Sequence, residues 1–168
     1  FTDGPVKNID TGKVYTSIQA AIDDDATQDG QTIQVSSGTY YEHQIIITKA
    51  LTIQGAGWAS TIINGSDATL PGCGLVSIVA SGDVTFSGFT VRDAGGPTNG
   101  GDGGDGLTNM GIFAQSSSTS ATYTITDNKI IGTNNPDDYE DFGFYAQDGC
   151  EHLVFHDKIV TQTASNNI

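Results

Sequence analysis

Two segments rich in glycine and asparagine hold most of the acidic side chains in the second half of the chain. They are residues 95–109 (GGPTNGGDGGDGLTN) and residues 133–141 (TNNPDDYED). The carboxylates that they offer as candidate metal ligands are Asp102, Asp105, Asp137, Asp138, Glu140 and Asp141. Such oxygen ligands suit Ca²⁺. The two segments therefore predict a calcium site if the fold brings them together, and the alternative is that they are solvated turns.

Three residues near these segments are candidates for acid–base chemistry. They are Arg92, Lys129 and Asp138, and Arg92 lies directly before the first acidic segment. A positioned base beside a carboxylate is what a polysaccharide lyase or a glycoside hydrolase needs. Arg92 is also followed by Asp93, and an adjacent pair of this kind more simply forms a local surface ion pair.

A possible ligand-binding set lies around residues 143–149 (GFYAQDG). Neighbouring side chains in a strand point to opposite faces, so Phe144 and Tyr145 cannot both be buried in the same core. Tyr145, with Gln115 and Gln147, is the set that we expect to face outward toward a sugar. Tyr40, Tyr41 and Trp58 are also able to stack on sugars, but we expect them to pack near the N-terminal end.

The charge of the chain restricts its partners. It has 20 acidic and only 6 basic residues among 168, for a formal net charge of −14. Such a surface repels nucleic acid and anionic lipid, so neither is an expected partner. The longest apolar runs are too short to cross a membrane as a helix, so membrane insertion is not expected. Neutral ligands, or contacts mediated by a cation, are favoured.

The elements that must position these residues are short repeated strands. The unit YTITDNKII (123–131) has a short apolar strand, a polar corner and a second strand, and it recurs as VTFSGFTV (84–91) and LVFHDKIV (153–160). We expect Asn128 to lie at a corner of the coil and to bond the backbone of the adjacent coil, and Lys158 to take the nearest equivalent place in the last coil. The many glycines, 22 in all, fit a chain of short strands and tight corners.

One amphipathic helix is predicted ahead of these repeats. Tyr15, Ile18 and Ile22 share one face at helical spacing, and Thr16 with Gln19 forms a capping-box pair. Aspartates after residue 22 oppose the helix dipole and predict that the helix ends there. A helix at this place would cover the open hydrophobic end of a stack of strands.

The strands that open each later coil align as GLVSIVA from Gly74, GIFAQ from Gly111 and GFYAQDG from Gly143. Both acidic segments then lie at the same place in the repeat, just before such a strand. In a stacked coil this places them next to each other on one edge. That edge is where we expect a functional site.

Several stretches resemble right-handed parallel β-helix proteins of the pectate-lyase-like superfamily, especially NosD-like and cell-surface members from bacteria and archaea. They are TSIQAAID (16–23), TIQVSSGTYYE (32–42), ITKALTIQGAG (47–57), STIING (60–65) and ITDNKI (125–130). The resemblance covers nearly the whole chain. It implies an all-β, short right-handed parallel β-helix with an N-terminal capping helix, but it is weak for function because the superfamily includes several enzyme classes and non-catalytic proteins.

The catalytic motifs of the enzymes in this superfamily are not complete in the chain. Asp141-Phe142-Gly143-Phe144 only partly resembles the GxxDFIFG motif of pectin methylesterases, and it lacks their arginine. The NTD, GHG and RIK motifs of polygalacturonases do not occur. Pectate lyases need an arginine or lysine near calcium-binding aspartates, and Arg92 is the only arginine.

These observations predict an N-terminal cap over residues 1–44 and β-helix coils over residues 45–168, which continue as part of a longer solenoid or end against a partner. The expected function is an extracellular or cell-surface module that binds carbohydrate without catalysis. A polysaccharide lyase or glycoside hydrolase, or a structural unit that self-associates at its C-terminal end, are the alternatives. No cofactor is required, and Ca²⁺ is the candidate ion.

Overall fold

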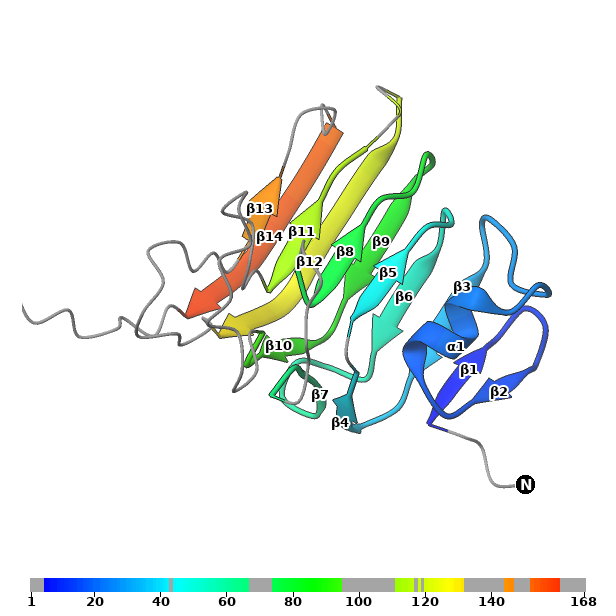
Figure 1. Ribbon diagram of the computed structural model, residues 1–168, viewed down its shortest axis with the longest axis horizontal. Helices are drawn as coiled ribbons and strands as arrows, with labels where there is room; N and C mark the ends of the chain where they lie inside the picture. Colours follow the sequence, from blue (N-terminus) through cyan, green and yellow to red (C-terminus); the bar gives the residue numbers. More distant parts are fainter. Residues whose placement is uncertain are drawn as a thin grey trace, which may run out of the picture.

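The structure is a computed structural model that describes residues 5–42, 44–66, 74–94, 111–116, 118, 120–131, 144–146 and 152–160. In this part of the chain the strands stack into a parallel coil, with one short helix at the N-terminal end (Figure 1). A ten-stranded sheet bends at one long strand and so forms two sides of the coil, and a four-stranded sheet forms the third.

The strands are short, as the repeated sequence units predict. The first side holds β3 (Thr32–Val35), β6 (Thr52–Gly55), β9 (Val84–Ser87) and the first parts of β12 (Thr122–Ile131) and β14 (His152–Val160). The second side holds β4 (Gly38–Tyr41), β7 (Thr61–Asn64), β10 (Thr90–Arg92) and the later parts of β12 and β14. The third side holds β5 (Ile45–Ile47), β8 (Val76–Ile78), β11 (Ile112–Ala114) and β13 (Phe144–Ala146).

The register repeats from coil to coil. On the first side, Ile33, Ile53, Phe86, Ile125 and Phe155 are partners in successive parallel strands. The first four have side chains with no exposed surface. The predicted alignment of the units at residues 84, 123 and 153 is therefore confirmed. Inward positions of all three sides form one continuous apolar core, in which the rings of Phe86 and Phe89 stack at a centroid distance of 4.6 Å.

The corner between the first and second sides is held by a buried asparagine. Asn128 Nδ2 donates to the carbonyl of Phe86 at 3.0 Å, and its Oδ1 accepts from the amide of Phe89 at 3.0 Å. Its side chain is 2% exposed, so both backbone groups of the neighbouring coil are satisfied without water. This is the role expected from the sequence. Gly88, at this corner with a φ of 82°, would bring a Cβ within 2.7 Å of the Gly55 carbonyl, so that no larger residue fits.

Two details of the predicted register are wrong. Val76, not Leu75, is the partner of Ile112 and hence of Phe144, so the alignment from Gly74 is displaced by one residue. Gly74 has a φ of 60°, which turns the chain and moves the start of the strand. On β14 the register shifts at the corner, so Lys158 pairs with Lys129 and does not take the place of Asn128.

The N-terminal residues form a hairpin and a short helix. β1 (Val6–Asn8) pairs with β2 (Val14–Tyr15) and lies antiparallel on β3, at the edge of the first side. The helix α1 (Ile18–Asp23) has six residues and buries Ile18, Ala21 and Ile22. It ends where the aspartates predict.

The expected capping box of the helix is not what the structure has. Ser17, rather than Thr16, is the N-cap, and its side chain accepts from the amide of Ala20. Gln19 instead bonds the backbone of Ile46 through both its amide oxygen, at 2.6 Å, and its amide nitrogen, at 3.3 Å. Ile46 lies on β5, the edge strand of the third side, so its backbone groups are open on one side of the sheet. Gln19 bonds these groups instead of forming a capping box with Thr16. Within the described ranges, no helix is long and apolar enough to cross a membrane.

Candidate functional site

The structure describes four of the residues predicted to bind or react, and it places them on two different sides of the coil. Arg92 and Lys129 lie on β10 and β12 of the second side, where these strands are parallel neighbours. Tyr145 lies on β13 of the third side, opposite Phe113 in register, while Gln115 follows β11 and is exposed. Phe144, next to Tyr145, packs against the core.

The remaining predicted residues lie outside the described part of the chain. They are Gln147 and the carboxylates Asp102, Asp105, Asp137, Asp138, Glu140 and Asp141. The strands that bracket the two acidic segments are described, and they are neighbours: β10 pairs with β12, and β11 pairs with β13. Among the described residues there is no group of three or more potential metal ligands, so the calcium site stays a prediction.

A half-exposed tryptophan covers the outer surface of the second side. Trp58 follows β6, and its carbonyl accepts a 2.6 Å hydrogen bond from the Thr90 hydroxyl on β10. The Nζ of Lys129 lies 5.7 Å from the centroid of its ring. Lys129 is the register partner of Thr90, so the loop that carries Trp58 reaches across two further coils. The indole is nevertheless 46% exposed.

The same outer surface carries a second exposed aromatic ring and a second cation. Tyr41, Asn64 and Arg92 are register partners on β4, β7 and β10, and Tyr41 is 62% exposed. Arg92 Nε lies 3.5 Å from a carboxylate oxygen of Asp93, and both side chains are partly exposed, so the pair is weak. We call Tyr41, Trp58, Arg92 and Lys129 the aromatic–basic surface.

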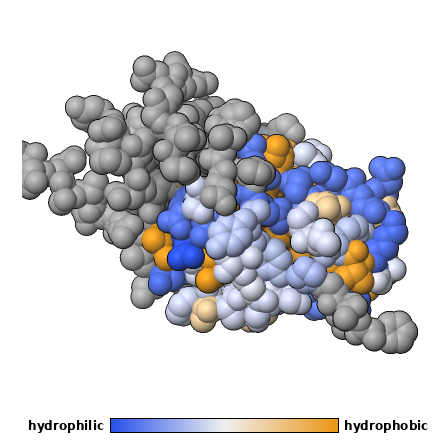
Figure 2. Space-filling view, turned by 60° about the horizontal axis from the view of Figure 1, so that its bottom comes forward, coloured by the Kyte–Doolittle hydropathy of each residue, from blue (hydrophilic) through white to orange (hydrophobic). Residues whose placement is uncertain are grey.

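Figure 2 brings the side formed by β4, β7 and β10 toward the viewer. The middle of this view is pale, the colour of residues with near-neutral hydropathy, and hydrophilic residues lie at both ends. Three of the 6 basic residues of the chain belong to strands of this side: Arg92, Lys129 and Lys158. Lys158 belongs here because it lies on β14 as the register partner of Lys129. An exposed aromatic ring next to a cation is able to stack on a sugar ring and to donate hydrogen bonds to its oxygens.

The expectation that all three aromatic residues pack near the N-terminal end is wrong for two of them. Tyr40 is 7% exposed, and its hydroxyl donates to the carbonyls of Pro5 and Ser36, as packing there requires. Tyr41 points to the opposite face of β4 because neighbours in a strand alternate. Trp58 is exposed because its loop is tied to Thr90 and Lys129 of later coils, which no local pattern reveals.

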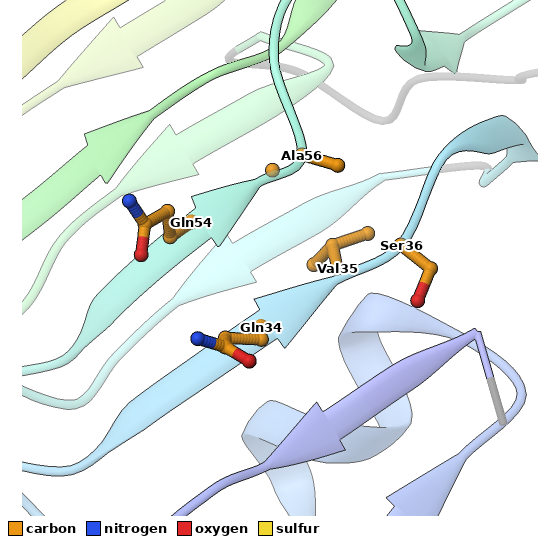
Figure 3. A pocket seen from close by; sticks show the side chains of 6 residues that line it. Gln34, Val35, Ser36, Gln54 and Ala56 are labelled. Atoms are coloured by element: carbon orange, nitrogen blue, oxygen red, sulfur yellow. The ribbon is translucent and has the colours of Figure 1, made fainter. Parts of the chain in front are cut away.

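Two hollows on the described surface are lined by other groups of residues, and Tyr41 belongs to one of them. One, of about 400 Å³, is lined by Gln34, Val35, Ser36, Gln54, Gly55 and Ala56 on the first side, and Figure 3 shows the amides of Gln34 and Gln54 on the same side of neighbouring strands. The other, of about 250 Å³, lies beside the helix and includes Thr16, Tyr41 and Glu42.

The carboxylate of Glu42 is held at the start of the helix. It accepts from the amides of Ile18, at 2.5 Å, and Gln19, at 3.0 Å, and burial raises its pKa although these two hydrogen bonds lower it.

Comparison by sequence finds one short similarity. Over 59 residues, 35% of this chain, the sequence is 49% identical to a cell surface glycoprotein of Methanothermus fervidus. The chain spans 9% of the length of that protein. No protein-family model matches the chain.

Comparison by structure finds two pectin methylesterases. One was solved in complex with a hexasaccharide, and its TM-score is 0.52 over 87% of this chain and 45% of its own. The other is PemA from Erwinia chrysanthemi, with a TM-score of 0.51 over 80% of this chain and 42% of its own. Each is 19% identical in sequence, so these matches concern the fold alone. The chain has the right-handed parallel β-helix fold that the pectin methylesterases of the pectate-lyase-like superfamily have.

Proposed function

We propose that this chain is a module of a cell-surface protein and that it binds carbohydrate at the aromatic–basic surface without turning it over. The observation that carries the proposal is the half-exposed Trp58, whose backbone carbonyl accepts from the Thr90 hydroxyl and whose ring lies next to the Lys129 ammonium on the outside of the second side. The similarity to part of a cell surface glycoprotein supports the location.

The chemistry of this surface suits a sugar better than the other ligand classes. A flat aromatic ring offers apolar contact to the C–H face of a sugar, while Lys129 and Arg92 offer hydrogen-bond donors around it. The cation–π contact at an exposed position is worth only about 0.5–1 kcal/mol, so a ligand is able to displace the Lys129 ammonium from the ring. With 20 acidic residues in the chain, nucleic acid is not a competing ligand.

Replacement of Trp58 tests the proposal. We expect Trp58→Ala to weaken binding to glycan hexasaccharides about tenfold or more, because the stacking surface is lost. Isothermal titration calorimetry against neutral and acidic hexasaccharides measures this. Ile9→Ala is the matched control, since Ile9 is 44% exposed, close to the 46% of Trp58, but lies in the loop of the N-terminal hairpin between β1 and β2. Equal binding by the two variants would contradict the proposal, as would the absence of binding to every glycan.

Two alternatives predict different results in the same experiment. Release of reducing or unsaturated ends, lost in Arg92→Ala or in Asp138→Ala, would make the protein a hydrolase or a lyase. Assembly of the chain without binding to any glycan would favour a structural unit, and sedimentation measures it. The set that the sequence predicts to face outward, Tyr145, Gln115 and Gln147, is proposed as a second place where a sugar would bind.

We also infer that α1 closes the N-terminal end of the core, despite having only six residues. Gln19 satisfies the edge of β5, Glu42 accepts from the first helical amides, and Lys49 Nζ donates to the carbonyls of Ile22, at 2.7 Å, and Asp24, at 3.0 Å. Both ends of the helix are thus joined to the first coil. These contacts and the buried Ile18 and Ile22 support a capping role.

A further inference from the structure

The outer surface of the first side has two regular rows of uncharged polar side chains. One row is Thr32, Thr52, Thr85 and Thr124, and the other is Gln34, Gln54, Ser87 and Thr126. All are exposed or partly exposed. Neighbouring members of a row belong to strands that are roughly 4.8 Å apart, so the rows form a flat, repeating surface. We call these two rows the neutral strip.

The hydrogen-bonding groups of the neutral strip are available. Within the described residues, none of its hydroxyl or amide side chains makes a hydrogen bond to another residue of the chain. At one end, Gln34 and Gln54 line the 400 Å³ hollow, with their amides on the same side of β3 and β6 (Figure 3). The strip therefore offers donors and acceptors in rows that a ligand would meet again at each coil.

The charge distribution restricts what this strip binds. No member of either row is charged, although the net charge of the chain is −14. Beyond the rows, Lys7 on β1 is the register partner of Gln34, and His156 on β14 is that of Thr126, so a cation borders one end of the strip. Carboxylates lie along its edges: Asp10 accepts from the amide of Thr32, and Asp83 accepts from the amide of Thr122, each at 2.7 Å. Asp127, at the corner of β12, is exposed. These edges repel a polyanion, whereas an uncharged polar chain meets no such barrier.

We propose that the neutral strip binds an extended, uncharged, β-linked polysaccharide that lies across the strands. Each sugar of such a chain is about as long as the roughly 4.8 Å step between strands, so successive sugars meet equivalent side chains. A protein partner is disfavoured because the two rows contain no aromatic or large apolar anchor of the kind found at the centre of protein interfaces. The strip is separate from the aromatic–basic surface, and its binding does not depend on Trp58.

The test introduces one charge on the strip and the same charge away from it. Thr85→Glu changes the central threonine, and Thr48→Glu, at an exposed position after β5, is the matched control. We expect Thr85→Glu to weaken binding of cellohexaose, mannohexaose or xylohexaose by roughly tenfold, and Thr48→Glu to leave it unchanged. A double variant, Gln34→Ala with Gln54→Ala, removes hydrogen bonds without adding charge and should have a similar effect.

Calorimetry with these neutral probes, and with hexagalacturonate as the acidic counterpart, separates the outcomes. Weaker neutral binding in Thr85→Glu than in Thr48→Glu supports the strip, whatever the effect of Trp58→Ala on the second side. Equal binding by Thr85→Glu and Thr48→Glu overturns it, even where Trp58→Ala shows that the second side binds sugar. Tighter binding of hexagalacturonate than of every neutral probe, or no binding of any neutral probe, also overturns it. Circular dichroism and thermal melting confirm that each variant is folded.

Discussion

At the scale of single residues, buried polar groups hold the corners of the coil. Asn128 is 2% exposed and bonds two backbone groups of the preceding coil, whereas the neutral residues on the outside have no such partners. Burial and hydrogen bonding therefore distinguish residues that stabilise the fold from residues that are candidates for ligand binding. A polar side chain that is buried and satisfied stabilises the fold, and one that is exposed and unpaired is free for a ligand.

Asn128→Ala should lower the free energy of unfolding by about 2–4 kcal/mol, because the carbonyl of Phe86 and the amide of Phe89 lose their partners in a buried place. Urea unfolding measures the change. Thr126→Ala, in the same strand but on the outside, is the control and should shift stability by less than about 0.5 kcal/mol. Similar losses in both variants would mean that the corner is open to water.

At the scale of elements, the helix is held by the first coil rather than by its own propensity. Six residues are too few for an independent helix. Its first amides are satisfied by Glu42, which follows β4, and its last carbonyls by Lys49, which follows β5. The carboxylate faces the positive end of the helix dipole, as expected for an N-terminus, but it does so in a partly buried place.

This placement predicts a pH dependence. Burial raises the pKa of Glu42 above its ordinary value of 4.5, so the folded state holds the proton more strongly than the unfolded state does. The stability linked to this group is therefore fully present below pH 4.5 and is lost as the pH rises through the raised pKa. In urea unfolding at several pH values, the advantage of the wild type over Glu42→Gln should shrink across that window.

The control for this prediction is Asp25→Asn, which removes one negative charge at an exposed position of the same region. It accounts for the effect of the net charge alone. An advantage of the wild type that grows as the pH rises would show that the two backbone hydrogen bonds outweigh the burial of the carboxylate.

At the scale of the whole molecule, the dominant property is an excess of acidic residues on a parallel coil. The strands that bracket both acidic segments are register neighbours, whereas the segments themselves lie outside the described residues. A net charge of −14 also opposes the compact state by self-repulsion. A bound divalent cation would relieve part of that repulsion.

If the acidic segments bind Ca²⁺, saturating calcium should raise the melting temperature, because a ligand at about 100 times its Kd adds about 2.7 kcal/mol of stability. Chelation should reverse the effect, and Asp137→Ala with Asp138→Ala should remove it. Differential scanning calorimetry at constant ionic strength, with Mg²⁺ as the comparison, separates binding from screening. An equal response to both cations, or none to calcium, would contradict the site.

Much of the fold could be predicted from local patterns, whereas the aromatic–basic surface could not. The units around Ile125 and Phe86 align because each coil must place an apolar residue inside at the same position. The predicted capping box at Thr16 is wrong because Ser17 satisfies the same local rule and is the N-cap, while Gln19 bonds the backbone of Ile46 on a distant strand. Local patterns predict packing for Trp58 and miss its exposure, because its neighbours in space come from coils far along the chain.

The sequence by itself determined the repeated coil, the inward apolar positions of the units around Phe86 and Ile125, and the role of Asn128, because strand alternation and corner chemistry act over only a few residues. Only the tertiary structure decided which outward residues share a surface. The register brings Thr32, Thr52, Thr85 and Thr124 into one row, although they come from four different coils. Loops of unequal length separate those coils in the sequence. Surfaces built across coils therefore appear only once the strands are stacked.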